Sequence, residues 1–140
     1  STTSITLPLG LAYIAASLEA SGREVTVVDA VGLAPRRHTG YYKGYLVGLR
    51  LEDIVARIPP DARFVGISVI FTHEWPAVVR LVELIREARA NLTIVLGGEH
   101  TTAMPEFSLS TSAADILVLG EGEETAVALA GALEAGTPLE

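Results

Sequence analysis

Short apolar runs alternate with segments of helical period along this chain, and that alternation constrains its fold more than any other feature. The runs are rich in β-branched residues and leucine, as strands of a parallel sheet buried on both faces are: residues 24–29, 63–70, 92–96 and 116–119. Helices are predicted around them over residues 9–21, 51–58, 74–90, 105–110 and 123–135. Such alternation implies right-handed crossovers, so we expect a doubly wound, Rossmann-like (flavodoxin-like) α/β domain of three layers.

The start of the chain departs from this pattern. Such a fold ordinarily opens with a strand, yet residues 1–8 offer only Ile5-Thr6-Leu7 before Pro8. Either the first strand is very short or it lies upstream of residue 1, and we favour the second. In a flavodoxin-like order, 2-1-3-4-5, that strand is central, so we expect the isolated chain to be unstable or to borrow a strand. Residues 31–50 show neither period clearly and are expected to form a long loop or excursion.

Size and charge limit the possible functions. With 140 residues, 49% of them hydrophobic, the chain has the size of a single domain spanning residues 1–140. The net charge is −7, and no cluster of basic residues is longer than Arg36-Arg37, so nucleic acid and anionic membranes are not expected partners. No cysteine is present to form a disulfide or to hold an iron–sulfur cluster. No apolar run has the ~18 residues of a membrane span, and we expect a cytoplasmic location.

Two glycine-rich turns each follow an apolar run directly. They read Gly97-Gly98-Glu99-His100 and Gly120-Glu121-Gly122-Glu123-Glu124-Thr125. The carboxyl ends of parallel strands line the binding crevice of such a sheet, and glycine there lets a flat ligand approach the backbone. Taken singly, each turn is equally well explained as a tight connection from strand to helix. Together they indicate a binding edge.

Four motifs in order carry a family resemblance. They are Pro8-Leu9-Gly10-Leu11-Ala12-Tyr13-Ile14-Ala15, Val65-Gly66-Ile67-Ser68, Leu96-Gly97-Gly98-Glu99-His100 and Gly120-Glu121-Gly122-Glu123-Glu124-Thr125. From about residue 8 to residue 134 the chain resembles the N-terminal cobalamin-binding domain of cobalamin-dependent radical S-adenosylmethionine enzymes. The resemblance implies a domain that holds cobalamin, vitamin B12, with its dimethylbenzimidazole tail displaced from cobalt (base-off) and buried in the domain.

The resemblance also implies a division of labour. The chain is expected to be a fragment of a larger enzyme, a methyltransferase, in which methylcobalamin delivers a methyl group. S-adenosylmethionine and a 4Fe-4S cluster are expected only in a separate catalytic domain that is absent from this chain. No residue here is expected to be catalytic or to bind a metal, and the chain alone is expected to be catalytically inert.

The cofactor-binding residues implied by the resemblance lie at the three strand ends. They are Ser68, Val69, Ile70, Thr72, Gly97, Gly98, Glu99, His100, Gly120, Glu121 and Gly122. The serine hydroxyl can meet a base nitrogen or a nucleotide-loop oxygen between apolar walls, although a serine here equally well caps the following helix. Backbone amides at the second glycine turn can meet ribose or phosphate oxygens.

One departure from the wider cobalamin-binding class concerns the lower axial ligand. Its Asp-x-His-x-x-Gly motif has no match, because Asp29 is followed by Ala30, Val31 and Gly32. His73 can approach a corrin, but a cap or a solvent-facing residue at a helix entry is the commoner role, and His38 has no evident partner.

Three further groups have open roles. We expect His100 to satisfy backbone groups near the first glycine turn. Trp75 either covers a flat macrocycle or serves as a hydrophobic staple or docking residue. Tyr41, Tyr42 and Tyr45 face the same choice, and we favour interdomain packing.

Two other functions compete with cofactor binding. One is a cobalamin-free docking or substrate-binding scaffold within a radical S-adenosylmethionine enzyme. The other, a phosphoacceptor receiver, requires clustered aspartates and a lysine at strand ends, whereas the chain's one lysine, Lys43, lies in the expected loop. The sequence leaves open the substrate, the choice between methyl transfer and another radical outcome, the axial ligand to cobalt and the oligomeric state.

Overall fold

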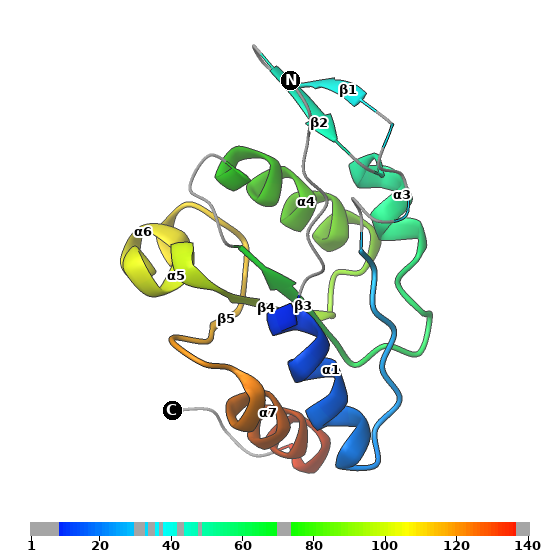
Figure 1. The fold of residues 1–140 in the computed structure, drawn as a ribbon, viewed down its shortest axis with the longest axis vertical. Helices are drawn as coiled ribbons and strands as arrows, with labels where there is room; N and C mark the ends of the chain where they lie inside the picture. The colour runs from blue at the N-terminus through cyan, green and yellow to red at the C-terminus, as the bar shows by residue number, and fades with distance from the viewer. Residues whose placement is uncertain are drawn as a thin grey trace.

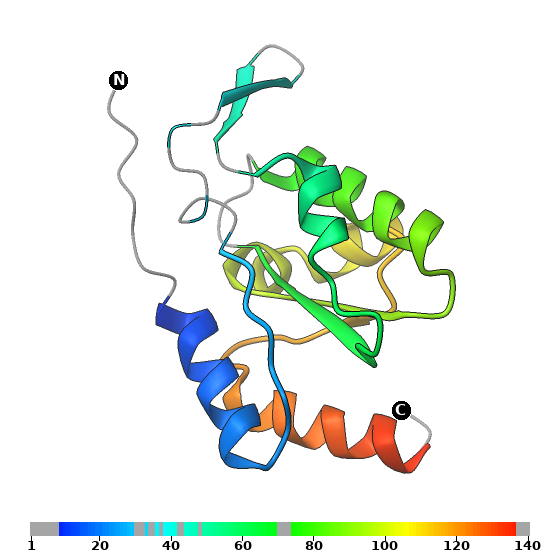
Figure 2. The ribbon, with the colours of Figure 1, turned by 90° about the vertical axis from the view of Figure 1, so that its right-hand side faces the viewer.

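A parallel sheet lies between two layers of helices (Figures 1 and 2). The computed structural model describes residues 9–29, 33, 36, 38–41, 44–47, 49–69 and 74–136. The sheet has the order β3-β4-β5, formed by Phe64–Ser68, Thr93–Gly97 and Ile116–Leu117. On one face lie α3 (Leu51–Ala56) and α4 (Trp75–Ala88), and on the other lie α1 (Leu9–Ala20) and α7 (Glu123–Ala135). The prediction of a flavodoxin-like α/β fold is confirmed.

The core lies between the sheet and α4. Ile94 and Leu96 of β4 are fully buried, and they pair in parallel register with Val65 and Ile67 of β3. Side chains of successive strand residues alternate between faces, so these four residues share the face that α4 covers. This packing agrees with the apolar runs predicted for residues 63–70 and 92–96.

The helix α4 buries four of the five residues of its predicted apolar stripe, and the fifth, Ala88, is exposed. Val78, Leu81, Val82 and Ile85 recur at helical spacing, and all four are buried. Burial of a side chain of this size stabilises a fold by roughly 1.5–3 kcal/mol. Pro76 lies in the first turn, where its missing N–H costs little.

The second helical layer is formed by α1 and α7, which lie side by side in both views (Figures 1 and 2). Ala15 and Leu18 of α1 and Leu129 and Ala130 of α7 are buried. Arg23, just after α1, donates two hydrogen bonds to the Glu134 carboxylate, at 2.9 Å and 3.0 Å. This two-bond ion pair joins the carboxyl ends of the two helices.

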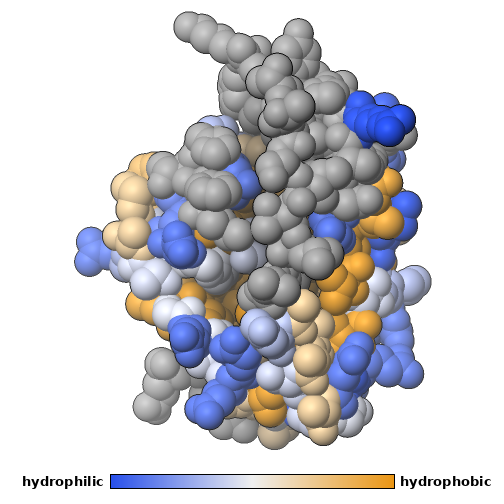
Figure 3. Space-filling model, in the orientation of Figure 1, coloured by the Kyte–Doolittle hydropathy of each residue, from blue (hydrophilic) through white to orange (hydrophobic). Residues whose placement is uncertain are grey.

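Two short helices follow β4. They are α5 (Glu99–Ala103), which was not predicted, and α6 (Pro105–Ser110), which was. None of the helices in the described residues is long and apolar enough to cross a bilayer. On the face shown in Figure 3, hydrophobic side chains are dispersed among hydrophilic ones.

Three details of the prediction differ from the structure. Residues 24–29 form no strand: none of the described segments pairs with them, and the Val27 side chain is 46% exposed. The expected loop at residues 31–50 contains an antiparallel hairpin, β1 (His38–Tyr41) with β2 (Gly44–Val47). Strand β5 also ends two residues earlier than predicted. Residues 1–8 lie outside the described part of the chain, so the short or missing first strand stays a prediction.

Candidate functional site

The carboxyl ends of the three strands bring the predicted site residues to one edge of the sheet. Ser68, the last residue of β3, is paired in register with Gly97, the last residue of β4. Val118 follows β5, and its amide donates to the Leu96 carbonyl at 2.8 Å. The glycine turns at residues 97–100 and 120–125 therefore lie side by side at this edge. Ile70 and Thr72, also predicted for the site, and His73 lie outside the described residues.

Ser68 and Val69 face opposite sides of the sheet. Val69 is fully buried in the core cluster that includes Trp75 and Val78. Ser68 is exposed, as is Gly66 two residues before it, because side chains alternate along a strand. A methyl group built at Gly66 would meet nothing within 4 Å. As far as the described residues go, the face of β3 turned away from α4 is thus open at Gly66 and Ser68.

The two glycines of the first turn differ in how much space the neighbouring residues leave them. Gly98 has φ +106°, and a methyl group on it would lie 2.4 Å from the Val69 carbonyl oxygen. This position must be glycine because the turn after β4 crosses closely over the end of β3, where the His100 amide donates to Val69 O at 3.1 Å. A methyl group at Gly97 would make only ordinary contacts, 3.7 Å to Val118 O and 3.8 Å to Val118 Cβ. Nothing in the described part of the chain requires glycine at residue 97.

The second glycine turn connects β5 with α7. Gly120 has φ +76°, which favours glycine, and its amide donates to the Thr102 hydroxyl oxygen at 3.0 Å. A methyl group on Gly122 would lie 3.3 Å from Ile14 Cδ1 and 3.7 Å from Val118 Cγ1. Ile14 of α1 is therefore a wall of the same edge. Glu121 is exposed, and Glu123 and Glu124 occupy the first turn of α7, where the helix dipole favours negative charge.

His100 is a core residue. Its side chain is 2% exposed and stacks on Trp75, with ring centroids 4.7 Å apart and an angle of 29° between the planes. Trp75 is 6% exposed, and its Nε1 donates to Thr111 Oγ1 at 3.1 Å. The indole therefore closes the core at the start of α4, which agrees with the staple interpretation and not with a face that covers a macrocycle. Glu99, between Gly98 and His100, is exposed.

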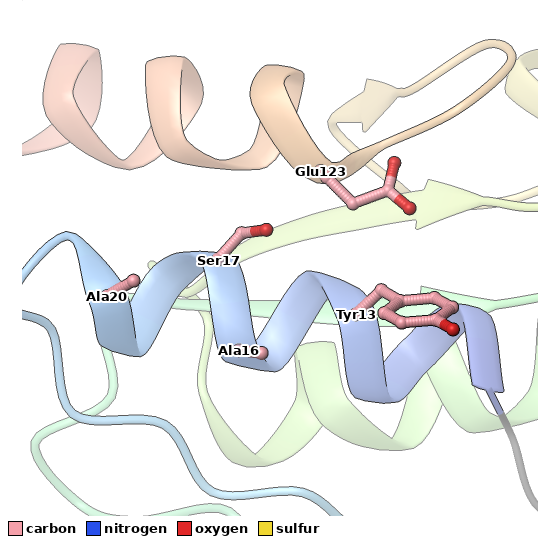
Figure 4. A pocket seen from close by; sticks show the side chains of 5 residues that line it. All are labelled: Tyr13, Ala16, Ser17, Ala20 and Glu123. Atoms are coloured by element: carbon pink, nitrogen blue, oxygen red, sulfur yellow. The ribbon is translucent and has the colours of Figure 1, made fainter.

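A groove runs between α1 and α7 on the outer side of this helix pair. It has a volume of ≈ 520 Å³, and its lining comes from five residues: Tyr13, Ala16, Ser17, Ala20 and Glu123. Figure 4 shows the Ser17 and Glu123 side chains on the facing sides of the two helices. None of the residues predicted for the site lines this groove. In the part of the chain that the structure describes, no three His, Asp or Glu side chains form a group that could hold a metal ion.

The sequence did not identify three residues of this edge as site residues: Gly66, Ile14 and Thr102. Gly66 carried a signal, because a glycine inside a strand often marks a close approach by a ligand or another backbone. Ile14 and Thr102 carried none, because their places depend on contacts between segments far apart in the chain.

A family model, described as the B12 binding domain, matches residues 1–130. The chain is 36% identical to the cytidylyl-2-hydroxyethylphosphonate methyltransferase of Streptomyces wedmorensis, over 86% of this chain and 23% of that protein. It is 31% identical to an uncharacterized methyltransferase of Pyrococcus horikoshii (95% of this chain, 26% of that one). It is 33% identical to the anaerobic magnesium-protoporphyrin IX monomethyl ester cyclase of a Synechocystis species (91% and 23%). The chain thus spans about a quarter of the length of these curated relatives.

Among solved structures, the N-terminal domain of a hypothetical protein from Thermotoga maritima matches with a TM-score of 0.54. The match covers 94% of this chain and 92% of that one at 20% identity. At that identity the likeness concerns the fold alone.

Proposed function

This chain belongs to the B12-binding domain family, and from that premise we propose that it is the cobalamin-holding module of a radical S-adenosylmethionine methyltransferase. In the proposed complex, cobalamin is bound base-off, with its nucleotide tail in the domain. The observation that carries the proposal is the open face of β3 at Gly66 and Ser68, beside Gly97. A strand face lined by the smallest side chains, at the ligand-binding edge of the sheet, offers space that the described residues do not fill.

The residues at this edge suit the chemistry of a nucleotide tail. A flat benzimidazole ring needs close approach to backbone and a few polar groups, and Gly66, Gly97 and the exposed Ser68 hydroxyl supply both. Val118 and Ile14 add apolar contact beside Gly97 and Gly122. Val69, Ile70 and Thr72 remain members of the proposed site on the strength of the family resemblance.

Charge at the second glycine turn favours a ligand with little negative charge. Glu121 belongs to this turn, Glu123 and Glu124 follow it in the first turn of α7, and the whole chain carries −7. A polyphosphate would be repelled by these carboxylates, whereas the single phosphodiester of cobalamin requires only one or two amide donors.

Methyl transfer enters the proposal through the relatives. Two of the three are named as methyltransferases. When bound, cobalamin supplies a cobalt centre that can carry a methyl group; the residues of this chain hold and orient its tail. The chain contains no cysteine, so the ligands of the proposed 4Fe-4S cluster, together with the S-adenosylmethionine site, belong to a separate catalytic domain.

The test is a titration of the chain with hydroxocobalamin, followed by absorbance spectra after reduction to cobalt(II). We expect stoichiometric binding with a base-off spectrum. Ser68→Trp fills the open face of β3 and should abolish binding. Ser110→Trp, on another exposed serine, in α6, is the matched control and should bind like the wild type.

A folded wild-type chain that does not bind cobalamin would overturn the proposal. It would instead favour the cobalamin-free docking or substrate-binding scaffold. A circular dichroism spectrum and a cooperative thermal transition establish that the chain is folded in this test.

A further inference from the structure

Thr102 connects the two glycine turns of the binding edge. Its Oγ1 lies 3.0 Å from the Gly120 amide nitrogen and 3.0 Å from the Gly98 carbonyl oxygen. We infer that Thr102 is a positioning residue that sets the spacing of the two turns for the nucleotide tail of cobalamin. The inference rests on the proposed function.

The direction of both hydrogen bonds follows from the groups involved. The Gly120 amide can only donate, so the Thr102 hydroxyl oxygen accepts from it. The hydroxyl hydrogen is then available for the Gly98 carbonyl, which can only accept. A hydrogen-bonded chain therefore runs from Gly120 through Thr102 to Gly98, and a threonine or a serine can complete it while valine, of the same shape, cannot.

The second turn has few other attachments to the first. Strand β5 pairs with β4 over only two residues, and the last ladder bond joins Val118 N to Leu96 O. Gly120 then adopts φ +76° in a turn with large conformational freedom. Among the described residues, Thr102 makes the one hydrogen bond recorded between the two turns. Without it, the amides of residues 120–122 lose their fixed distance from Gly97 and Gly98.

Thr101 provides a matched control within the same helix. Its Oγ1 also lies 3.0 Å from the Gly98 carbonyl oxygen, but its hydroxyl has no recorded bond to Gly120. Thr101→Val therefore removes a bond to the first turn and leaves the connection between the turns in place.

The experiment compares two probes on the same protein. Hydroxocobalamin carries the nucleotide tail, and cobinamide has the same corrin without it. For Thr102→Val we expect hydroxocobalamin to bind about five- to tenfold more weakly, the typical effect of one lost hydrogen bond, while cobinamide binding stays unchanged. Thr102→Ser should restore the wild-type affinity, and Thr101→Val should stay within about twofold of it.

Several results would overturn the inference. They are an unchanged hydroxocobalamin affinity in folded Thr102→Val, an equal loss for both probes, or a loss in Thr101→Val as large as in Thr102→Val. A wild-type chain that binds neither probe overturns the proposed function itself, which is a distinguishable failure. Should Thr102→Val fail to fold, amide hydrogen exchange in the wild type decides: the Gly120 amide must exchange more slowly than the Glu121 amide, and equal rates would contradict the inference.

Discussion

The indole of Trp75 stacks on the imidazole of His100, with ring centroids 4.7 Å apart. The contact joins the first residue of α4 to the second residue of α5, which is also the last residue of the first glycine turn. His100 is also held through its backbone, because its amide donates to the Val69 carbonyl at 3.1 Å. The stacked rings and this backbone hydrogen bond thus hold the turn that carries Gly97 and Gly98 against the core.

Replacement of Trp75 by alanine should destabilise the domain strongly. The side chain is 6% exposed, and its removal leaves a cavity beside His100 and also removes the hydrogen bond to Thr111. We expect a loss of about 3–5 kcal/mol in the free energy of unfolding, measured by urea denaturation. Phe107 is the control: its ring centroid lies 6.2 Å from that of Trp75, but its side chain is 43% exposed. Phe107→Ala should lower the free energy of unfolding by about 1 kcal/mol or less. Equal losses in the two variants would contradict the core role of Trp75.

Adjacent glycines at the end of β4 should respond differently to alanine. Gly98→Ala places a methyl group 2.4 Å from the Val69 carbonyl oxygen at a positive φ, so we expect a loss of about 2 kcal/mol or more in stability. Gly97→Ala meets only ordinary contacts within the chain and should change stability by less than about 1 kcal/mol.

Gly97→Ala, which should hardly affect stability, is the variant expected to affect cobalamin binding directly. If Gly97 is glycine for the sake of the ligand, Gly97→Ala should weaken hydroxocobalamin binding although the domain stays folded. Thermal melts and titrations on the same preparations measure both effects. A Gly97→Ala variant with wild-type affinity would remove Gly97 from the proposed site.

Sequence predicts best those elements whose apolar residues recur at the spacing of the helix or strand that buries them. The stripe of α4 and the runs of β3 and β4 bury residues in their own period, so local pattern and packing agree. Residues 24–29 have a strand-like composition, but a strand also needs a neighbour for its backbone hydrogen bonds, and the described residues supply none. The hairpin of β1 and β2 was not predicted, because its strands contain glycines and tyrosines without a clear alternation of apolar and polar residues.

The candidate site was predictable at the level of its edge but not of its contacts. Glycines after apolar runs located the edge, since strand ends in a parallel sheet meet there. Gly98 leaves no space for a methyl group, whereas Gly97 does. This difference depends on how closely the end of β3 approaches the turn, which the local sequence pattern does not show. The bond from Gly120 to Thr102 spans 18 residues and depends on the same three-dimensional approach.

Arg86 should contribute more to stability than Arg80, the other arginine of α4. It donates to the Asp115 carboxylate at 2.7 Å, to Leu92 O at 2.8 Å and to Ala113 O at 3.0 Å, and so holds together the segments that enter β4 and β5. We expect Arg86→Ala to cost about 1–3 kcal/mol in the free energy of unfolding.

Arg80, on the same helix, is the matched control for Arg86. Its partner Glu83 lies at 2.9 Å, but both side chains are about half exposed, so Arg80→Ala should change the free energy of unfolding much less than Arg86→Ala does. Urea denaturation at one salt concentration measures both variants. An Arg86→Ala variant as stable as Arg80→Ala would show that the contacts of Arg86 do not hold the strand entries together.

Amide hydrogen exchange should separate residues 24–28 from the sheet. In the described structure their amides have no recorded backbone acceptor, whereas those of residues 94–96 lie in the middle of the paired strand β4. We expect residues 24–28 to exchange at rates close to those of an unfolded chain and residues 94–96 to exchange at least about a hundredfold more slowly, by NMR at neutral pH. Slow exchange at residues 24–28 would contradict this expectation. It would show that this valine-rich segment pairs with a strand outside the described residues. That strand could also pair with β3, whose outer edge has no partner among the described strands.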